Sequence, residues 1–170
     1  MNTWFTSDTH FDHAEIIQYC NRPFKDVEHM NEALIRNWNS RIKPYDFVIF
    51  LGDFVFKKSR RVDYFLDRLN GNITFLKGNH DHHNSLNTRI ESLVVKIAGQ
   101  EVFCTHNPAT FNRAFKINLV GHVHDAWLIQ KRDASLLVNM SVDVWKYLPV
   151  NINEILRAIN RYKSESGENV

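Results

Sequence analysis

Five short polar clusters punctuate the chain, and each directly follows an apolar run that resembles a strand. Together the clusters contain carboxylates, imidazoles and one amide, side chains that bind metal ions through oxygen and nitrogen. They constrain the fold, because the carboxyl ends of strands are where ligands usually bind in open α/β sheets. The clusters are Asp8-Thr9-His10, Gly52-Asp53, Gly78-Asn79-His80-Asp81, Thr105-His106-Asn107 and Gly121-His122-Val123-His124.

The order of the apolar runs predicts an α/β fold. In the first half, strands alternate with helices, and Asp26 is a suitable N-cap for the longer helix. The second half is rich in strands, with turns at 98–100 and 131–133, and ends in a helix capped by Asn153. Two packed sheets with helices on the outer faces satisfy this order. The predicted strands are 2–6, 46–51, 73–76, 93–97, 101–105, 117–120, 126–130 and 135–139, and the helices are 26–39, 60–69 and 153–162.

The size and composition of the chain favour one soluble domain. We expect residues 1–163 of the 170 to form it and the polar residues 164–170 to be a flexible tail. The net charge of +2 is too small to indicate a nucleic-acid partner by itself. Cys20 and Cys104 make no disulfide framework, which favours a cytoplasmic protein. The sequence shows neither a signal peptide nor an apolar run long enough to span a membrane.

The spacing within the clusters suits metal ligation. In an extended segment, residues two apart lie on the same side, as for Asp8 and His10 and for His122 and His124. Oxygen and nitrogen ligands without sulfur favour Mn²⁺, with Fe, Zn, Ni or Co as alternatives. With two divalent ions, the two carboxylates Asp8 and Asp53 and a bridging hydroxide leave about one positive charge to attract a phosphate. The sequence therefore predicts a catalytic centre with two divalent metal ions.

The five clusters, in this order, resemble the signature of the calcineurin-like metallophosphoesterase superfamily. The resemblance covers nearly the whole chain, and its opening residues are similar to those of the small cap-less bacterial and phage members. It implies a four-layer α/β/β/α sandwich. After Gly52-Asp53 the protein Ser/Thr phosphatase branch continues Asp-Arg-Gly, whereas this chain continues Phe54-Val55-Phe56, so that branch is disfavoured.

The resemblance also implies a role for each site residue. One metal would be bound by Asp8, His10 and His124, the other by Asn79, His106 and His122, and Asp53 would bridge both. His80 would donate a hydrogen bond or a proton to the substrate, and Asp81 would orient it. The implied activity is hydrolysis of a small phosphoester by a hydroxide that the two metals activate.

Several further expectations concern the substrate. His13 could contact the phosphate or the leaving group, or simply begin a helix, and Arg22 could neutralise charge on the substrate or belong to a packed turn. Lys57, Lys58, Arg60 and Arg61 form a small basic cluster that favours a solvated loop and helix start over a contact with the phosphates of a nucleotide or a nucleic acid. We expect a phosphodiesterase, with a phosphomonoesterase, a nuclease and a non-catalytic interaction scaffold as alternatives. The sequence does not distinguish between oligomeric states.

Overall fold

Two mixed β-sheets pack against each other in the structure, a computed structural model that describes residues 1–56, 59–81, 86 and 88–167. The first sheet has the strand order β3-β2-β1-β9, with β1, β2 and β3 parallel and β9 antiparallel to β1. Its strands are β1 (Thr3–Thr6), β2 (Phe47–Phe50), β3 (Asn72–Phe75) and β9 (Val150–Asn151).

The second sheet has five strands in the order β4-β5-β6-β8-β7. Its central strands β5, β6 and β8 are parallel, and β4 and β7 pair antiparallel at the two edges. The strands are β4 (Ser92–Ile97), β5 (Gln100–Thr105), β6 (Ile117–Val120), β7 (Ile129–Arg132) and β8 (Ser135–Asn139). The α/β class with two mixed sheets is confirmed.

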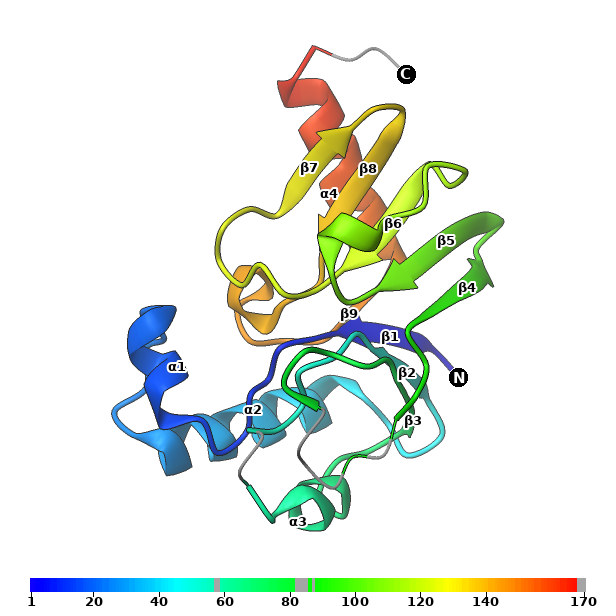
Figure 1. Cartoon of the computed structure of the whole chain (residues 1–170). Helices are drawn as coiled ribbons and strands as arrows, with labels where there is room; N and C mark the ends of the chain where they lie inside the picture. The colour runs from blue at the N-terminus through cyan, green and yellow to red at the C-terminus, as the bar shows by residue number, and fades with distance from the viewer. Residues whose placement is uncertain (57–58, 82–85, 87, 168–170) are drawn as a thin grey trace.

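Helices cover the outer face of the first sheet. They are α2 (Val27–Arg41) and α3 (Val62–Leu66), which lie below the first sheet in Figure 1, whereas α1 (Ala14–Tyr19) stands to one side, at the left of the view. Asp26 caps α2 as predicted, since its carboxylate accepts the amide of His29 at 2.7 Å. The apolar face of α2 packs Leu34 and Trp38 against Val48 and Phe50. Fully burying a side chain of this size stabilises a fold by about 1.5–3 kcal/mol.

A second core fills the space between the sheets. It joins Phe5 and Leu51 of the first sheet with Val102 and Leu119 of the second. The apolar face of α4 (Ile152–Glu165) packs into the same core, behind the second sheet in Figure 1. The opposite face of the second sheet is covered by the segment 106–116, where Phe115 stacks on Phe103 with ring centroids 5.6 Å apart.

Several element boundaries differ from the sequence prediction. Asn151, rather than Asn153, caps α4, because its side chain and that of Glu154 form a reciprocal capping box. The helix continues through Ser164 and Glu165, which we expected in the tail, so the domain limit at residue 163 stays a prediction. The strand predicted at 126–130 begins only at Ile129 and runs through Arg132. The turn follows at Asp133, whose φ of 54° lies in the left-handed region.

A helix beginning at His13 was one of the two expectations for that residue, but no range was predicted for the helix α1. It is six residues long and buries one side chain, Ile16, so it leaves no periodic apolar stripe in the sequence. Its first turn follows His13, which occupies the N-cap position without a side-chain capping bond. Among the described residues, no helix is long and apolar enough to cross a membrane.

Candidate metal centre

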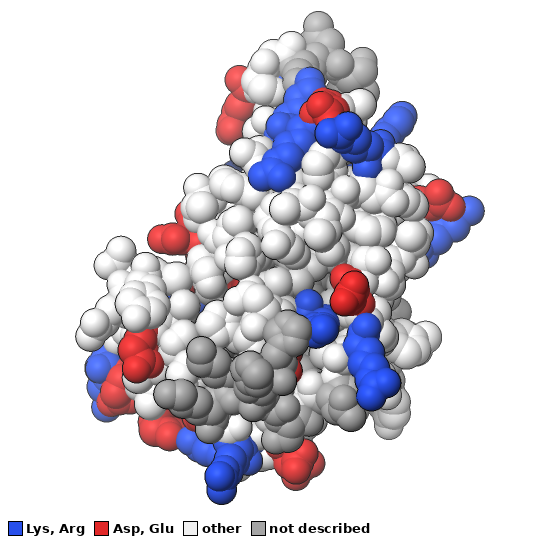
Figure 2. Space-filling view, in the orientation of Figure 1, with Lys and Arg blue, Asp and Glu red and all other residues white. Residues whose placement is uncertain are grey.

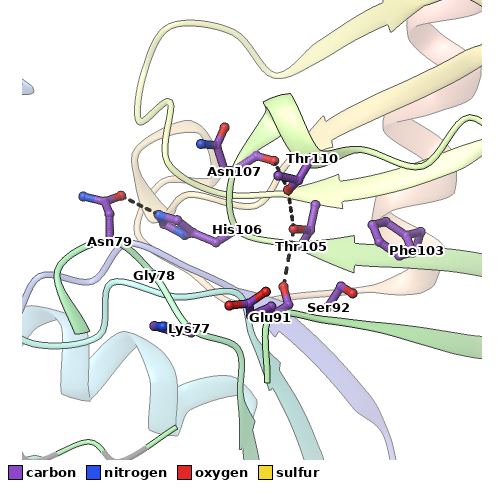
Figure 3. Close-up of a pocket in the computed structure, with 10 residues that line it drawn as sticks. All are labelled: Lys77, Gly78, Asn79, Glu91, Ser92, Phe103, Thr105, His106, Asn107 and Thr110. Atoms are coloured by element: carbon purple, nitrogen blue, oxygen red, sulfur yellow. Dashed lines mark hydrogen bonds between the residues drawn. The ribbon is translucent and has the colours of Figure 1, made fainter. Parts of the chain in front are cut away.

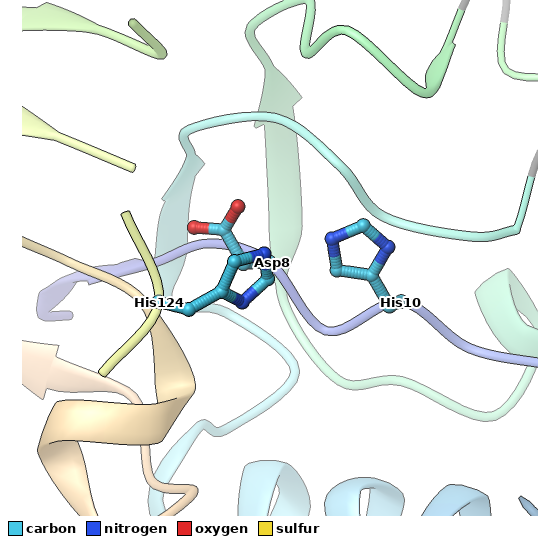
Figure 4. A group of neighbouring side chains, drawn as sticks. All are labelled: Asp8, His10 and His124. Atoms are coloured by element: carbon cyan, nitrogen blue, oxygen red, sulfur yellow. The ribbon is translucent and has the colours of Figure 1, made fainter. Parts of the chain in front are cut away.

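The five polar clusters meet where the carboxyl ends of strands from both sheets face each other. The ligand atoms of Asp8, His10 and His124 lie within 4.8 Å of one another, as do those of Asp53, His106 and His122. Figure 4 shows the first of these groups, in which His124 lies beside Asp8 and His10 although it is more than 110 residues away in the sequence. A third group, His10, Asp53 and His80, also has its ligand atoms within 4.8 Å of one another. The first two groups are therefore adjacent, and Asp53 lies next to ligands of both.

The backbone at the centre is strained. Asp8, His10, Asp53, His122 and His124 all have φ between 46° and 73°, a region that residues other than glycine rarely adopt. Each such residue costs on the order of 1–3 kcal/mol and persists only where the surroundings hold it. Here the amide of Asp8 donates to Gly52 O at 3.0 Å, and the amide of His10 donates to Asp53 O at 3.1 Å. Strain at five of the predicted ligands indicates a functional site.

His10 has a nitrogen that suits a metal ion. The side chain is fully buried, and Nε2 has no hydrogen-bond partner among the described residues, although Asp53 Oδ2 lies 3.5 Å away. Burial holds the pKa of His10 well below its usual value, so the imidazole is neutral near pH 7 and carries a lone pair. The other nitrogen, Nδ1, lies 3.3 Å from Nδ1 of His13. A buried, unsatisfied acceptor next to a carboxylate fits a cation well.

The second half of the centre brings together imidazole nitrogens and side-chain oxygens that can bind a cation. Nδ1–H of His106 donates to Leu51 O at 2.7 Å, which leaves Nε2 directed at Asn79 Oδ1, 2.9 Å away. His122 Nδ1 lies 2.8 Å from the same amide oxygen, and Asp53 Oδ2 lies 3.4 Å from His106 Nε2. Burial opposes charging of His106, but its bond to Asp53 raises its pKa to about 9. In the metal-free protein, His106 Nε2 therefore carries a proton at the position where a metal ion would bind.

His124 is held by Asp143, a residue that the sequence analysis missed. His124 Nδ1 lies 3.0 Å from Asp143 Oδ2, and a carboxylate of this kind orients a metal-binding imidazole. Burial opposes protonation of His124, but the bond to Asp143 raises its pKa to about 10. The available signal was a single carboxylate in the otherwise apolar segment that follows β8.

Arg22 has a different place from the one we expected. Its side chain is buried and binds both oxygens of Asp143, and it also donates to the carbonyls of Asp8 at 2.8 Å and Thr9 at 2.9 Å. The guanidinium therefore holds the loop that contains Asp8, Thr9 and His10, and its donors are occupied by protein groups. The carboxylate of Asp143 already neutralises the charge of the guanidinium, so Arg22 is not placed to neutralise charge on a substrate.

Asp81 joins the loops that present Asp53 and Asn79. Its buried carboxylate accepts the amides of Gly78 at 2.8 Å, Asp53 at 2.9 Å and Phe54 at 3.2 Å. The amide of His80 donates to Asp53 Oδ1 at 2.8 Å, and the His80 ring lies 4.9 Å from that of His10. His80 is therefore next to both half-sites, whereas its orientation by Asp81 stays a prediction.

The remaining candidate residues either are buried or lie outside the described part of the chain. His13 is buried at the edge of the centre, and burial, with the neighbouring His80, lowers its pKa to about 4, so it contributes no charge near pH 7. Asn31 of α2 is also buried and forms two hydrogen bonds with Asp12. Lys57, Lys58, His82 and His83 lie outside the described residues.

The fold and the centre define a class: an α/β sandwich whose ligand-bearing loops suit two metal ions. A model of the calcineurin-like phosphoesterase superfamily domain matches residues 1–140. The chain belongs to this superfamily, as the motifs predicted, and is a phosphoesterase by family.

Similar proteins extend the comparison over nearly the full chain. The protein MJ1445 of Methanocaldococcus jannaschii is 36% identical and aligns with 94% of this chain and 92% of its own length. The gene 66 protein of Mycobacterium phage L5 is 24% identical, with 98% of each chain covered. Among solved structures, AQ665 of Aquifex aeolicus has a TM-score of 0.69 at 22% identity, with 92% of this chain and 98% of that chain covered. Vps29 of Chaetomium thermophilum has a TM-score of 0.52 at 10% identity, with 83% and 73% covered. These two similarities show a shared fold.

Proposed function

We propose that the protein hydrolyses phosphodiesters with two divalent metal ions, Mn²⁺ being favoured. The observation that carries the proposal is the position of Asp53, whose carboxylate lies 3.5 Å from His10 Nε2 in one half-site and 3.4 Å from His106 Nε2 in the other. A carboxylate shared between two sets of imidazole ligands suits a pair of cations.

The residues divide into two ligand sets. Asp8, His10 and His124 would bind one ion, and Asn79, His106 and His122 the other, with Asp53 shared. The buried carboxylate of Asp8 accepts Ser7 Oγ at 2.5 Å and the amide of His122 at 3.1 Å, which hold it in place. When bound, the two ions would supply Lewis acidity at the phosphate oxygens and lower the pKa of a water molecule.

The chain supplies the remaining chemistry. His80 lies beside His10 and Asp53 and is partly accessible, so it can donate a proton to the departing alkoxide. His13 is neutral and braces His10 through its Nδ1, which keeps Nε2 of His10 directed inward. Asp81 holds the loops that contain Asp53 and Asn79 next to each other, because its carboxylate accepts the amides of Asp53 and Gly78.

The surface is consistent with a small substrate. On the face that Figure 2 shows, basic and acidic side chains lie mostly toward the edges, around a large uncharged area. A continuous basic track, which binding of a long nucleic acid favours, is not seen on that face. A nuclease is therefore the weaker alternative. The interaction scaffold is weaker still, because such a role would not require buried ligands held in strained conformations.

The test is hydrolysis by protein loaded with Mn²⁺ after complete removal of metal. We expect bis-p-nitrophenyl phosphate, a diester, to be hydrolysed with a higher kcat/KM than the monoester p-nitrophenyl phosphate, and the metal content to approach two ions per chain. The metal-free protein should be inactive. A preference for the monoester would favour the phosphomonoesterase, and a folded, metal-loaded protein that cleaves neither compound would favour the scaffold.

A further inference from the structure

Two separate hollows border the metal centre. One, of about 390 Å³, adjoins His10 and His124, and the other, also of about 390 Å³, adjoins Asn79 and His106. The described residues that line the first differ from those that line the second. A phosphate held by both ligand sets therefore has room for a substituent on each side.

Apart from the imidazoles around the metal centre and Asp125, the hollow beside His10 is lined by apolar and aromatic side chains, and we call it the apolar hollow. Its floor contains the buried Ile16 together with Cys20 and Val123, and Tyr19 of α1 stands at its rim with 72% of its surface exposed. His13, which also lines it, stacks on Phe56 with ring centroids 4.4 Å apart and an interplanar angle of 19°. An exposed tyrosine beside an apolar floor favours stacking with a flat aromatic group.

The hollow beside His106 is a groove lined with hydroxyl and amide groups together with Lys77, Glu91 and Phe103, and we call it the polar groove. Figure 3 shows it running from Asn79 and His106 past Thr105 to Phe103. Thr105 Oγ1 and Thr110 Oγ1 lie 2.8 Å apart, and Asn107 and Ser92 also line the groove. Groups of this kind both donate and accept hydrogen bonds, so they suit a ligand that carries several hydroxyls.

The two hollows differ in chemistry, and this difference identifies a substrate class. We propose, resting on the proposed function, that the substrate is an asymmetric phosphodiester with an aromatic arm in the apolar hollow and a hydroxylated arm in the polar groove. A monoester would leave one of the two hollows empty.

The position of His80 assigns the leaving group. Of the two hollows, as far as the described residues line them, His80 borders the apolar one. The oxygen of a water molecule forms a bond to phosphorus, the ester bond to the aromatic arm breaks with its electron pair, and that alkoxide takes a proton from His80. The water proton restores His80, so diester and water give an aromatic alcohol and a phosphomonoester of the hydroxylated arm.

Benzyl glyceryl phosphate tests this assignment, because both of its arms leave as primary alcohols and differ little in intrinsic reactivity. With the Mn²⁺-loaded protein we expect benzyl alcohol and glycerol phosphate, in roughly tenfold or greater excess over glycerol and benzyl phosphate. Product analysis by NMR distinguishes the two pairs. Equal amounts, or an excess of benzyl phosphate, would overturn the assignment while leaving the hydrolase itself intact.

Variants of residues that line the two hollows test where each arm of the substrate binds. Tyr19→Ala should raise KM for benzyl glyceryl phosphate roughly three- to tenfold, whereas Tyr19→Phe, which keeps the ring, should retain most of the affinity. Tyr45→Ala is the matched control, because Tyr45 is 79% exposed just before β2 and lines neither hollow. Thr110→Val should raise KM for the glyceryl ester but leave KM for dibenzyl phosphate unchanged.

A binding experiment avoids dependence on turnover. Benzylphosphonate cannot be hydrolysed, and saturation-transfer NMR should show its ring protons in contact with the wild-type protein and with Tyr45→Ala, but much less with Tyr19→Ala. Equal contact in all three proteins would overturn the aromatic site. If the metal-loaded protein cleaves no phosphoester at all, the proposed function fails, and this inference fails with it.

Discussion

Arg22 binds Asp143 through two parallel contacts, from Nε to Oδ1 at 2.8 Å and from Nη2 to Oδ2 at 2.9 Å, across 121 residues of sequence. The pair is buried, with 0% and 2% of the two side chains exposed. Asp143 in turn holds His124, and Arg22 also holds the carbonyls of Asp8 and Thr9. A single ion pair therefore connects two proposed ligands of the same metal ion.

Asp143→Asn should weaken metal binding. The amide is nearly isosteric, but it loses the charge that orients His124 and favours its Nδ1–H, and changes of this kind lower metal affinity by about 10- to 100-fold. Titration calorimetry with Mn²⁺ on metal-free protein measures the effect, which should fall on one of the two ions. Asp133→Asn, in an exposed pair with Arg113, is the control. Two ions bound with wild-type affinity would exclude a positioning role for Asp143.

Arg22→Met should destabilise the fold strongly. The substitution keeps the length of the side chain but removes the guanidinium that pairs with Asp143 and with the carbonyls of Asp8 and Thr9, and breaking a buried pair typically costs about 3–5 kcal/mol. Urea unfolding of the metal-free protein gives the free energy of unfolding. Arg113→Met removes an exposed pair and should cost less than about 1 kcal/mol. Similar values for the two variants would mean that the buried pair adds little.

Gly78→Ala should disrupt the centre by steric contact alone. A Cβ at Gly78 would overlap Asp53 Oδ1 and the Asp53 amide nitrogen, so the bridging carboxylate has to move. We expect loss of both bound ions, measured by elemental analysis. Gly99→Ala is the control, because its Cβ meets nothing within 4 Å and only the φ of +74° is unfavourable, at about 1–2 kcal/mol. Retention of two ions in Gly78→Ala would show that the loops can separate.

His80→Ala should reduce turnover and leave the metal content intact. General acid catalysis contributes about 10²- to 10⁴-fold, so kcat for a diester with a poor leaving group should fall within that range. Elemental analysis should still find two ions per chain. His29→Ala, on the exposed face of α2, controls for the loss of an imidazole. Full activity of His80→Ala would show that His80 is not the proton donor in catalysis.

Asp46 should make stability depend on pH. Its carboxylate accepts the amides of Asn2 at 2.7 Å and Lys43 at 3.0 Å and the indole of Trp4 at 3.0 Å, and these bonds, that from Asn2 foremost, lower its pKa. The stabilisation is therefore present above the unfolded-state pKa of about 3.9 and is lost as the pH falls through the lower folded-state pKa.

Urea unfolding of the wild type and of Asp46→Asn between pH 7 and pH 2 measures this contribution. The difference in unfolding free energy should be on the order of 1–3 kcal/mol at pH 7 and should shrink below pH 4. Asp67→Asn removes an exposed carboxylate and controls for net charge. A difference that stays constant over the whole range would assign the stabilisation to packing.

Part of this protein follows from local patterns alone. Strands such as β6 (Ile117–Val120) and β8 (Ser135–Asn139) were predicted with the observed bounds, because a short apolar run between polar turns has few other stable conformations. The cap of α2 at Asp26 depends on residues close together in the chain, and the family followed from the order of five clusters that are each only two to four residues long.

Other features were outside the reach of local patterns. The helix α1 is too short to show a period, and Asn151 and Asn153 are both plausible caps until the end of β9 is known. The role of Arg22 depends on a carboxylate 121 residues away, and the two hollows depend on how α1 and the segment 106–116 pack beside the ligands.

The sequence by itself determined which side chains are available for metal chemistry and which strands carry them, because ligand type and apolar periodicity are properties of short segments. Only the tertiary structure decided that Arg22 lies beneath the ligands, that His13 is neutral and braces His10, and that two unlike hollows adjoin the centre. The physical reason is that burial, charge pairing and cavity shape arise from contacts between distant segments.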